Sequence, residues 1–267
     1  MNSTKNSLLW EVTPPQQNRP SYLFGTMHVR DKRVFASMDK LTTYLHQCDA
    51  FAAEFDFQEI DIQAFEQASS LPDSISLSTA LSPKVYKKLE KIVARETQQS
   101  LELFEHRSPM FLLNLLAEVQ LSAEQQVALD KVLYNLAQQA DKTILGLETF
   151  EEQLAVFQHI NLKEQYRSLK QVATNFKRYR CSLHKVTQSY FEGNINKLYQ
   201  QSKRSIGSLR RVLLYERNLV MATRFEAYTQ EQTLFAAIGS GHLAGAKGVL
   251  RLLKHRGYRL RPLSYQL

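Results

Sequence analysis

Two histidines of this chain stand in the same short sequence context. SYLFGTMH places Gly25 three residues before His28, and TLFAAIGSGH places Gly239 three residues before His242. With seven histidines and nine glycines in 267 residues, chance gives only ~0.2 such pairs. An apolar run precedes each glycine, so each histidine is predicted to follow a sharp turn after a buried strand. Neutral imidazoles on separate loops are good ligands for a divalent metal.

A purely structural explanation of these pairs stays open. Each glycine would then serve a turn, and each histidine would pack or cap nearby. The repeated order of strand, turn and imidazole favours the other interpretation, in which two structural halves face each other across a cleft.

Two carboxylates are candidates to complete such a site. Glu54 lies in the apolar segment AAEFDF, where a carboxylate is costly to bury unless it is paired or bound to a cation. Two histidines and one carboxylate would hold a metal that lowers the pKa of water towards ~7. Glu148, in ILGLETFEEQ, could hold the water or orient a ligand. Alternatively, Glu148 is a helix-start carboxylate favoured by the helix dipole.

The segment LLYERNLVMA predicts a helix that carries Arg217 and Asn218 between apolar neighbours. Arg217 could hold a substrate carboxylate with two hydrogen bonds, or it could pair with Glu54 or Glu148 to support the fold. GSGHLA fits a loose dinucleotide-binding pattern, but no acidic residue follows Glu231 to bind a ribose. HExxH, P-loop and GxSxG motifs are absent from the sequence.

The elements that would position these residues alternate along the chain. LLWEV, SYLFGT, AFAAEFDF, KTILGLE, TLFAAIGSG and YRLRPLSY predict strands, and AFAAEFDF is apolar on both faces, as in an inner strand. Helical periodicity occupies most of the remainder, including helices over 36–46 and 245–255 with Gly257 as the stop. We predict an α/β fold with one mixed sheet, or two small related sheets, and a large helical insertion.

We predict a single domain over residues 1–267. Its strand-rich parts are 7–58 and 142–150, its helical parts are 60–140 and 162–228, and a strand-helix-strand unit occupies 232–265. Cys48 and Cys181 are too few for a disulfide framework and are predicted to be core residues.

The net charge of +8 would attract acidic partners, and much of it lies in FKRYR and SKRSIGSLRR. A solvated helix face is favoured over a nucleic-acid surface, because no nucleic-acid module surrounds these segments. No apolar run is long enough to span a membrane. The chain is expected to be cytoplasmic if it is the complete natural product, and periplasmic or secreted if a leader has been removed. The sequence does not indicate the oligomeric state.

SYLFGTMHV, AAEFD, ILGLETFEEQ, LLYERNLVMA and AAIGSGHLAGAKGVLRLLKHRGYRL resemble, in this order, segments of the TraB/GumN family, which includes the TIKI proteins. The resemblance implies two pseudo-symmetric α/β halves around a cleft, as in the erythromycin-esterase and ChaN-like group. It further implies a metallopeptidase site in which His28, Glu54 and His242 are the metal and catalytic residues. Glu148, Arg217 and Asn218 match other recurrent positions. The implied metal is Mn²⁺ or Co²⁺, with Zn²⁺ as an alternative.

The sequence thus predicts a metal-dependent hydrolase, in particular a peptidase of the TIKI type that acts on a peptide or protein. One alternative is a protein that sequesters a peptide or another ligand in the same cleft without cleaving it. A third hypothesis, haem or iron binding, depends only on the likeness to ChaN-like proteins.

Overall fold

The computed structural model describes residues 6–27, 32–35, 37–121 and 127–265. It divides into two compact units. The first, which we call the sheet unit, comprises Met1–Glu59, Ala123–Phe150 and Val186–Leu267. The second, which we call the helical unit, comprises Ile60–Ser122 and Glu151–Lys185.

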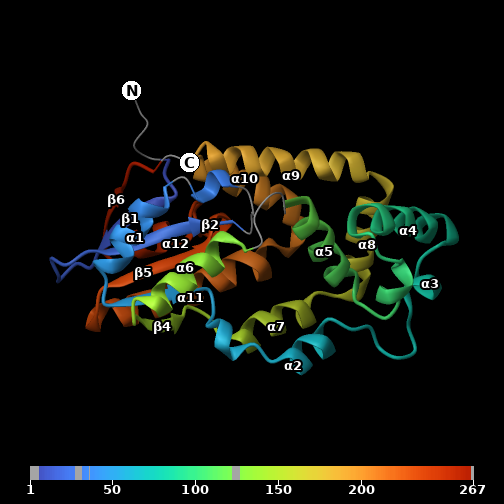
Figure 1. Cartoon of the computed structure of the whole chain (residues 1–267), viewed down its shortest axis with the longest axis horizontal. Helices are drawn as coiled ribbons and strands as arrows, with labels where there is room; N and C mark the ends of the chain where they lie inside the picture. The colour runs from blue at the N-terminus through green and yellow to red at the C-terminus, as the bar shows by residue number, and fades with distance from the viewer. Residues whose placement is uncertain (1–5, 28–31, 36, 122–126, 266–267) are drawn as a thin grey trace. The chain divides into compact units, whose positions relative to one another are not determined.

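The strands of the sheet unit form one mixed sheet. In the described residues it has six strands in the order β4-β3-β5-β2-β1-β6 (Figure 1). The strands are β1 Leu9–Thr13, β2 Ser21–Thr26, β3 Ala50–Ala53, β4 Thr143–Gly146, β5 Leu234–Gly239 and β6 Arg259–Pro262. The β4-β3, β3-β5 and β5-β2 pairs are parallel, whereas β1 pairs antiparallel with both β2 and β6. The central strands β2, β3 and β5 are almost wholly buried, as expected of apolar runs with a layer on each side.

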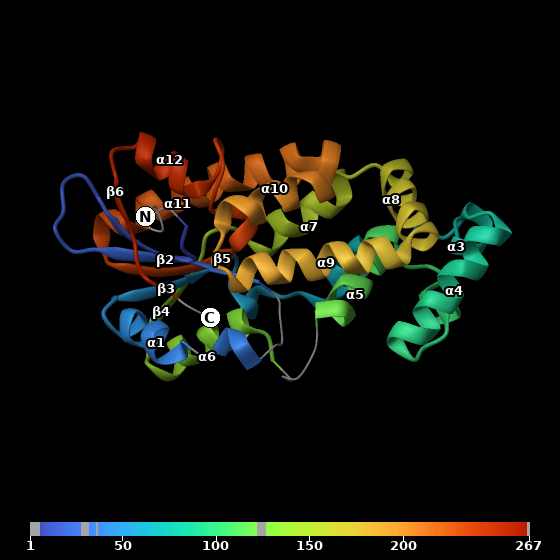
Figure 2. The ribbon, with the colours of Figure 1, turned by 90° about the horizontal axis from the view of Figure 1, so that it is seen from above.

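Helices cover both faces of this sheet. Figure 2 shows α1 Met38–His46 and α6 Leu129–Gln139 on one side of the strands, and α11 Arg217–Glu231 and α12 Val249–His255 on the other. The sheet unit also contains α10 Ile195–Ile206, which packs against the turn that follows β5. The result is a three-layer arrangement in which the carboxyl ends of the parallel strands remain available for a site.

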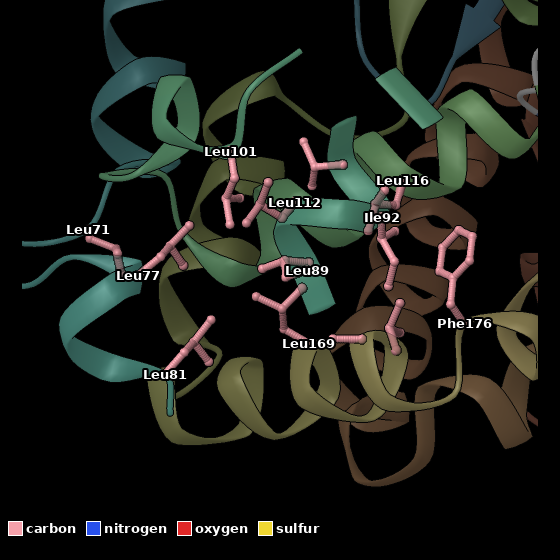
Figure 3. Packing of buried hydrophobic residues seen from close by; sticks show 13 residues of the cluster. Leu71, Leu77, Leu81, Leu89, Ile92, Leu101, Leu112, Leu116, Leu169 and Phe176 are labelled. Atoms are coloured by element: carbon pink, nitrogen blue, oxygen red, sulfur yellow. The ribbon is translucent and has the colours of Figure 1, made fainter. Parts of the chain in front are cut away.

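The helical unit has its own hydrophobic core. Its helices are α2 Ile62–Ala68, α3 Leu77–Ala80, α4 Pro83–Thr97, α5 Pro109–Leu121, most of α7 Phe150–His159, α8 Leu162–Thr174 and the start of α9 Phe176–Phe191. Leu89 of α4, Leu112 of α5 and Leu169 of α8 are fully buried and belong to one cluster (Figure 3). Pro83 and Pro109 each occupy the first turn of a helix, where the missing N–H costs nothing.

Most of the predicted elements are confirmed, and the α/β class with a single mixed sheet holds. The C-terminal helix begins at Val249 rather than at residue 245, because Gly245 has a φ of +96° that a helix does not allow. Cys48 is buried as predicted, but the prediction for Cys181 is wrong. Its side chain is exposed because it lies on a polar face of α9. The prediction of one domain over residues 1–267 stays a prediction.

Within the described parts of residues 6–265, no helix is both long enough and apolar enough to cross a bilayer.

Candidate functional site

The predicted site residues that the structure describes gather at one edge of the sheet. β2 and β5 are neighbours and run parallel, with Thr26 opposite Gly239, so both strands end at the same place. β3 lies on the other side of β5, and Glu54 follows its last residue. Glu148 follows β4, and its backbone N–H donates to the carbonyl oxygen of Glu54 at 2.7 Å. The parallel strand order therefore collects residues from four chain segments.

Arg217, the first residue of α11, joins the two carboxylates. Its Nε donates to Glu148 Oε1 at 2.9 Å, and its Nη2 donates to Glu148 Oε2 at 2.6 Å and to Glu54 Oε2 at 2.7 Å. The Glu148 side chain is only 2% exposed, and that of Arg217 is 16% exposed. Burial by itself lowers the pKa of Arg217, but the two carboxylates raise it by more, so the net shift is upward. The geometry matches the supporting role predicted for Arg217, and contact with substrate stays a prediction.

His242 is held in one orientation by Asn218. The Asn218 side-chain N–H donates to the Lys247 carbonyl at 2.7 Å, so its Oδ1 faces His242 and accepts a hydrogen bond from the Nδ1–H of the imidazole, with an N–O distance of 2.6 Å. The unprotonated Nε2 is then directed to the other side, 4.0 Å from Glu54 Oε1. Burial lowers the pKa of His242 to about 4, with Glu54 opposing that shift and Arg217 adding to it. The imidazole is therefore neutral at physiological pH.

The two motif glycines allow close packing between the ends of β2 and β5. The Gly239 N–H donates to Glu54 Oε1 at 2.7 Å, and a Cβ at this position would lie 2.9 Å from the same oxygen. A Cβ on Gly25 would lie 2.5 Å from Leu243 Cδ1 and 3.2 Å from the Cα of Ser240. Side chains at these positions would separate the two segments, so glycine is favoured here for reasons of space.

Two atoms at this edge have the chemistry of metal ligands. They are His242 Nε2, whose other ring nitrogen is tied by a hydrogen bond, and Glu54 Oε1, which also accepts from Gly239. His28, the other predicted histidine ligand, lies outside the described residues. Among the residues that are described, no three His, Cys, Asp or Glu side chains come together as a metal site. The donors present fit a divalent metal in type, but they supply only part of a ligand set.

Some contributors to this edge could not be found from spacing. Asn218 was placed on a helix and matched to a recurrent family position, but its contact with His242, 24 residues away, was not predicted. A π-helical segment, Arg211–Glu216, immediately precedes Arg217, and π-helical turns are frequent at functional sites. Tyr199 of α10 packs against Gly245 in the loop beyond His242. The sequence carries no local signal for the π-helical segment or for the packing of Tyr199.

The loop beyond His242 gives a prediction for stability. We expect Gly245→Ala to lower the free energy of unfolding by about 2–4 kcal/mol, since an L-residue is strained at φ +96° and its Cβ would lie 2.3 Å from the Tyr199 ring. Gly207→Ala is the matched control, because Gly207 has a φ of +60° but nothing within 4 Å of an added Cβ. Its φ/ψ of +60°/−122° is itself unfavourable for an L-residue, so backbone strain alone should cost about 1–3 kcal/mol. Urea unfolding of both variants measures the difference, and equal losses would contradict the packing argument.

The neutral state of His242 makes stability depend on pH. The unfolded chain takes up this proton near pH 6.5, and the folded chain does so only at about pH 4, so the native state binds fewer protons between those values. The contribution of neutral His242 to the free energy of unfolding is fully present above pH 6.5. It is lost as the pH falls towards 4, by about 3 kcal/mol in total. Urea unfolding at pH 7 and pH 5 should show a smaller pH-dependent loss in His242→Gln than in the unmodified protein. Identical losses in the two proteins would refute the assignment of this pH dependence to His242.

Several known proteins similar to this chain are named as TIKI metalloproteases. The metalloprotease TIKI2 of Danio rerio is 25% identical over 96% of this chain and 60% of its own length. The metalloprotease TIKI1 of Homo sapiens is 25% identical over 97% of this chain and 62% of its own length. A metalloprotease TIKI homolog of Amphimedon queenslandica is 23% identical, over 98% and 62% respectively. The chain thus spans about three fifths of the length of these relatives.

No solved structure matches this chain. The TraB/PrgY/gumN family matches it over residues 8–262, nearly its whole length and the same region in which the sequence motifs lie. The chain belongs to the TraB/PrgY/gumN family.

Proposed function

We propose that this protein is a metal-dependent peptidase that hydrolyses a peptide or protein substrate. One observation carries the proposal: the buried, neutral His242 directs its unprotonated Nε2 towards Glu54, 4.0 Å away, at the carboxyl ends of parallel strands. An imidazole and a carboxylate in this relation are typical ligands of catalytic metal sites. The metalloprotease names of the relatives agree with this chemistry.

His28 is proposed as the third ligand. It comes two residues after Thr26, which lies opposite Gly239 at the end of β2. Two trans peptide units span at most about 7 Å between Cα atoms. This short separation in sequence from the end of β2 supports the proposal of His28 as a ligand.

A divalent ion bound there would polarise the scissile carbonyl and activate water. Neighbouring residues orient His242 and Glu54 for binding this ion. Asn218 keeps the proton of His242 on Nδ1, so Nε2 stays available. Arg217 and the Gly239 N–H hold Glu54 in place, with one of its oxygens bonded to each. Glu54 is then oriented to bind the ion or to accept a proton from water.

The experiment combines metal analysis with an activity assay. The purified protein is stripped with chelator, reloaded with Mn²⁺, Co²⁺ or Zn²⁺, and incubated with a mixed peptide library whose products are identified by mass spectrometry. We expect about one equivalent of metal and cleavage only in reloaded samples. A stoichiometric metal without any cleavage would refute catalysis, and cleavage unaffected by chelator would refute the metal mechanism.

A second candidate function is supported by the engagement of Glu54. Its Oε1 already accepts from Gly239, and its Oε2 is paired with Arg217. A closed network of this kind could recognise a peptide by hydrogen bonds and sequester it without any metal. Equilibrium binding of intact peptide that is insensitive to chelator would favour this candidate over the peptidase.

A further inference from the structure

The helical unit contains a cavity that is separate from the residues discussed above. It has a volume of about 260 Å³ and is bordered by α2, α5 and α7, labelled in Figure 1. Its apolar lining includes Phe65, Phe111, Leu115, Leu154 and Phe157. A cavity of 150 Å³ already accommodates benzene. The space is therefore sufficient for one aromatic or large aliphatic side chain, while it is small for a complete cofactor.

Polar groups lie on the α5 side of this cavity. Asn114 and Glu118 both line it and are four residues apart, so they project from the same face of α5. The Asn114 amide can both donate to and accept from a peptide backbone. Glu118 is the single ionisable residue among the described residues that line the cavity. An occupant with a positive charge beside its apolar group would therefore complement the cavity electrostatically.

Exposed apolar side chains lie on or just before α2, one of the helices that border the cavity. Ile62 is 72% exposed and Phe65 is 38% exposed, and their spacing of three places them on one face of α2. Ile60, just before this helix, is 46% exposed. Exposed apolar side chains that adjoin a cavity are typical of binding surfaces. They provide contact area for the segments on either side of the inserted group.

We propose that this cavity binds a large apolar side chain of a peptide that carries Lys or Arg at the adjacent position. The apolar side chain is enclosed by the aromatic and leucine side chains, the cation lies near Glu118, and Asn114 hydrogen-bonds the peptide backbone. This peptide is a substrate only if the protein is the peptidase proposed above. Binding at the cavity does not require that function.

Three fluorescent dodecapeptides with one central pair in a Gly-Ser background test this inference. The pairs are Phe-Lys, Phe-Glu and Ala-Lys, and binding is followed by fluorescence anisotropy. We expect Phe-Lys to bind at least tenfold more tightly than Ala-Lys and about threefold more tightly than Phe-Glu. In methyl NMR, Leu115 and Leu154 should shift on binding, whereas the exposed Leu103 should not. Equal affinities for all three peptides, or shifts confined to other methyl groups, would overturn the inference.

Variants test the cavity directly. Ala68 lines it, so Ala68→Trp should fill it and weaken Phe-Lys binding at least tenfold, whereas Gln67→Trp on the exposed side of α2 should not. Glu118→Gln should remove the preference for Lys over Glu, with the exposed Glu90→Gln as its control. Circular dichroism checks that each variant is folded. Unchanged binding in both Ala68→Trp and Glu118→Gln would overturn the proposal.

Failure of this inference can be told apart from failure of the proposed function. In a His242→Ala background, peptide binding at the cavity should persist although hydrolysis is lost. Cleavage by a protein whose cavity binds none of the three peptides would end this inference and leave the peptidase standing. Binding without cleavage in the unmodified, metal-loaded protein would leave this inference standing and end the proposed peptidase function.

Discussion

Replacing Arg217 with Met should lower the free energy of unfolding by about 3–5 kcal/mol. The substitution preserves most of the side-chain volume but leaves Glu148, which is 2% exposed, without its three hydrogen bonds from the guanidinium. Glu54 loses its bond at 2.7 Å as well. Two carboxylates held together in a poorly solvated place repel each other once the cation is removed. Urea unfolding at pH 7 measures the loss.

The exposed pair Arg211–Glu216 provides a matched control. Its N–O distance of 2.8 Å is similar, but its side chains are 81% and 53% exposed. Arg211→Met should therefore change the free energy of unfolding by less than about 1 kcal/mol. Arg217→Lys should fall between the two, because Lys keeps the charge but cannot bind two carboxylates with a planar fork. Similar small losses for Arg217→Met and Arg211→Met would show that the buried network contributes no more than a surface pair.

Substitution of His242 with Ala should remove metal and reduce hydrolysis by about a thousandfold, which corresponds to several kcal/mol of transition-state stabilisation. His28→Ala should have the same effect if both histidines are ligands. Metal content is measured by elemental analysis and hydrolysis by initial rates with saturating Mn²⁺ or Co²⁺. Full activity of either variant under these conditions would contradict the proposed site.

Two further variants make this result specific. His255→Ala removes an exposed histidine at the end of α12 and should leave both readouts unchanged. Asn218→Ala removes the group that fixes the His242 tautomer, so metal affinity should fall by about 10- to 100-fold rather than disappear. If Asn218→Ala has no effect on metal affinity, the orientation of His242 by Asn218 is unimportant for binding.

Much of the fold follows from local pattern. The apolar runs before Gly25 and Gly239 predicted β2 and β5, and the leucines of residues 60–140 predicted helices, because alternation and helical periodicity are properties of a few consecutive residues. Prediction was weaker where a helix face had to be assigned. Cys181 was placed in the core, although α9 exposes that side of its surface.

The same limit applied to the candidate site. Glu54 was recognised as an unusual carboxylate in a predicted apolar strand, to be either paired or bound to a cation, and it lies just after β3 and is paired with Arg217. The sequence left open whether Arg217 pairs with Glu54 or Glu148 or instead holds a substrate carboxylate. A hydrogen bond between residues 163 positions apart in the chain depends on how α11 lies against the sheet, which no local pattern encodes.

The amino-acid sequence by itself determined the strands, most helices, the two glycine-histidine motifs and the family. The tertiary structure decided that β2 and β5 are neighbours, that Arg217 bridges Glu54 and Glu148, and that Asn218 fixes His242. The physical reason is that backbone conformation responds to neighbouring residues, whereas strand order and buried ion pairs result from the packing of the sheet unit as a whole.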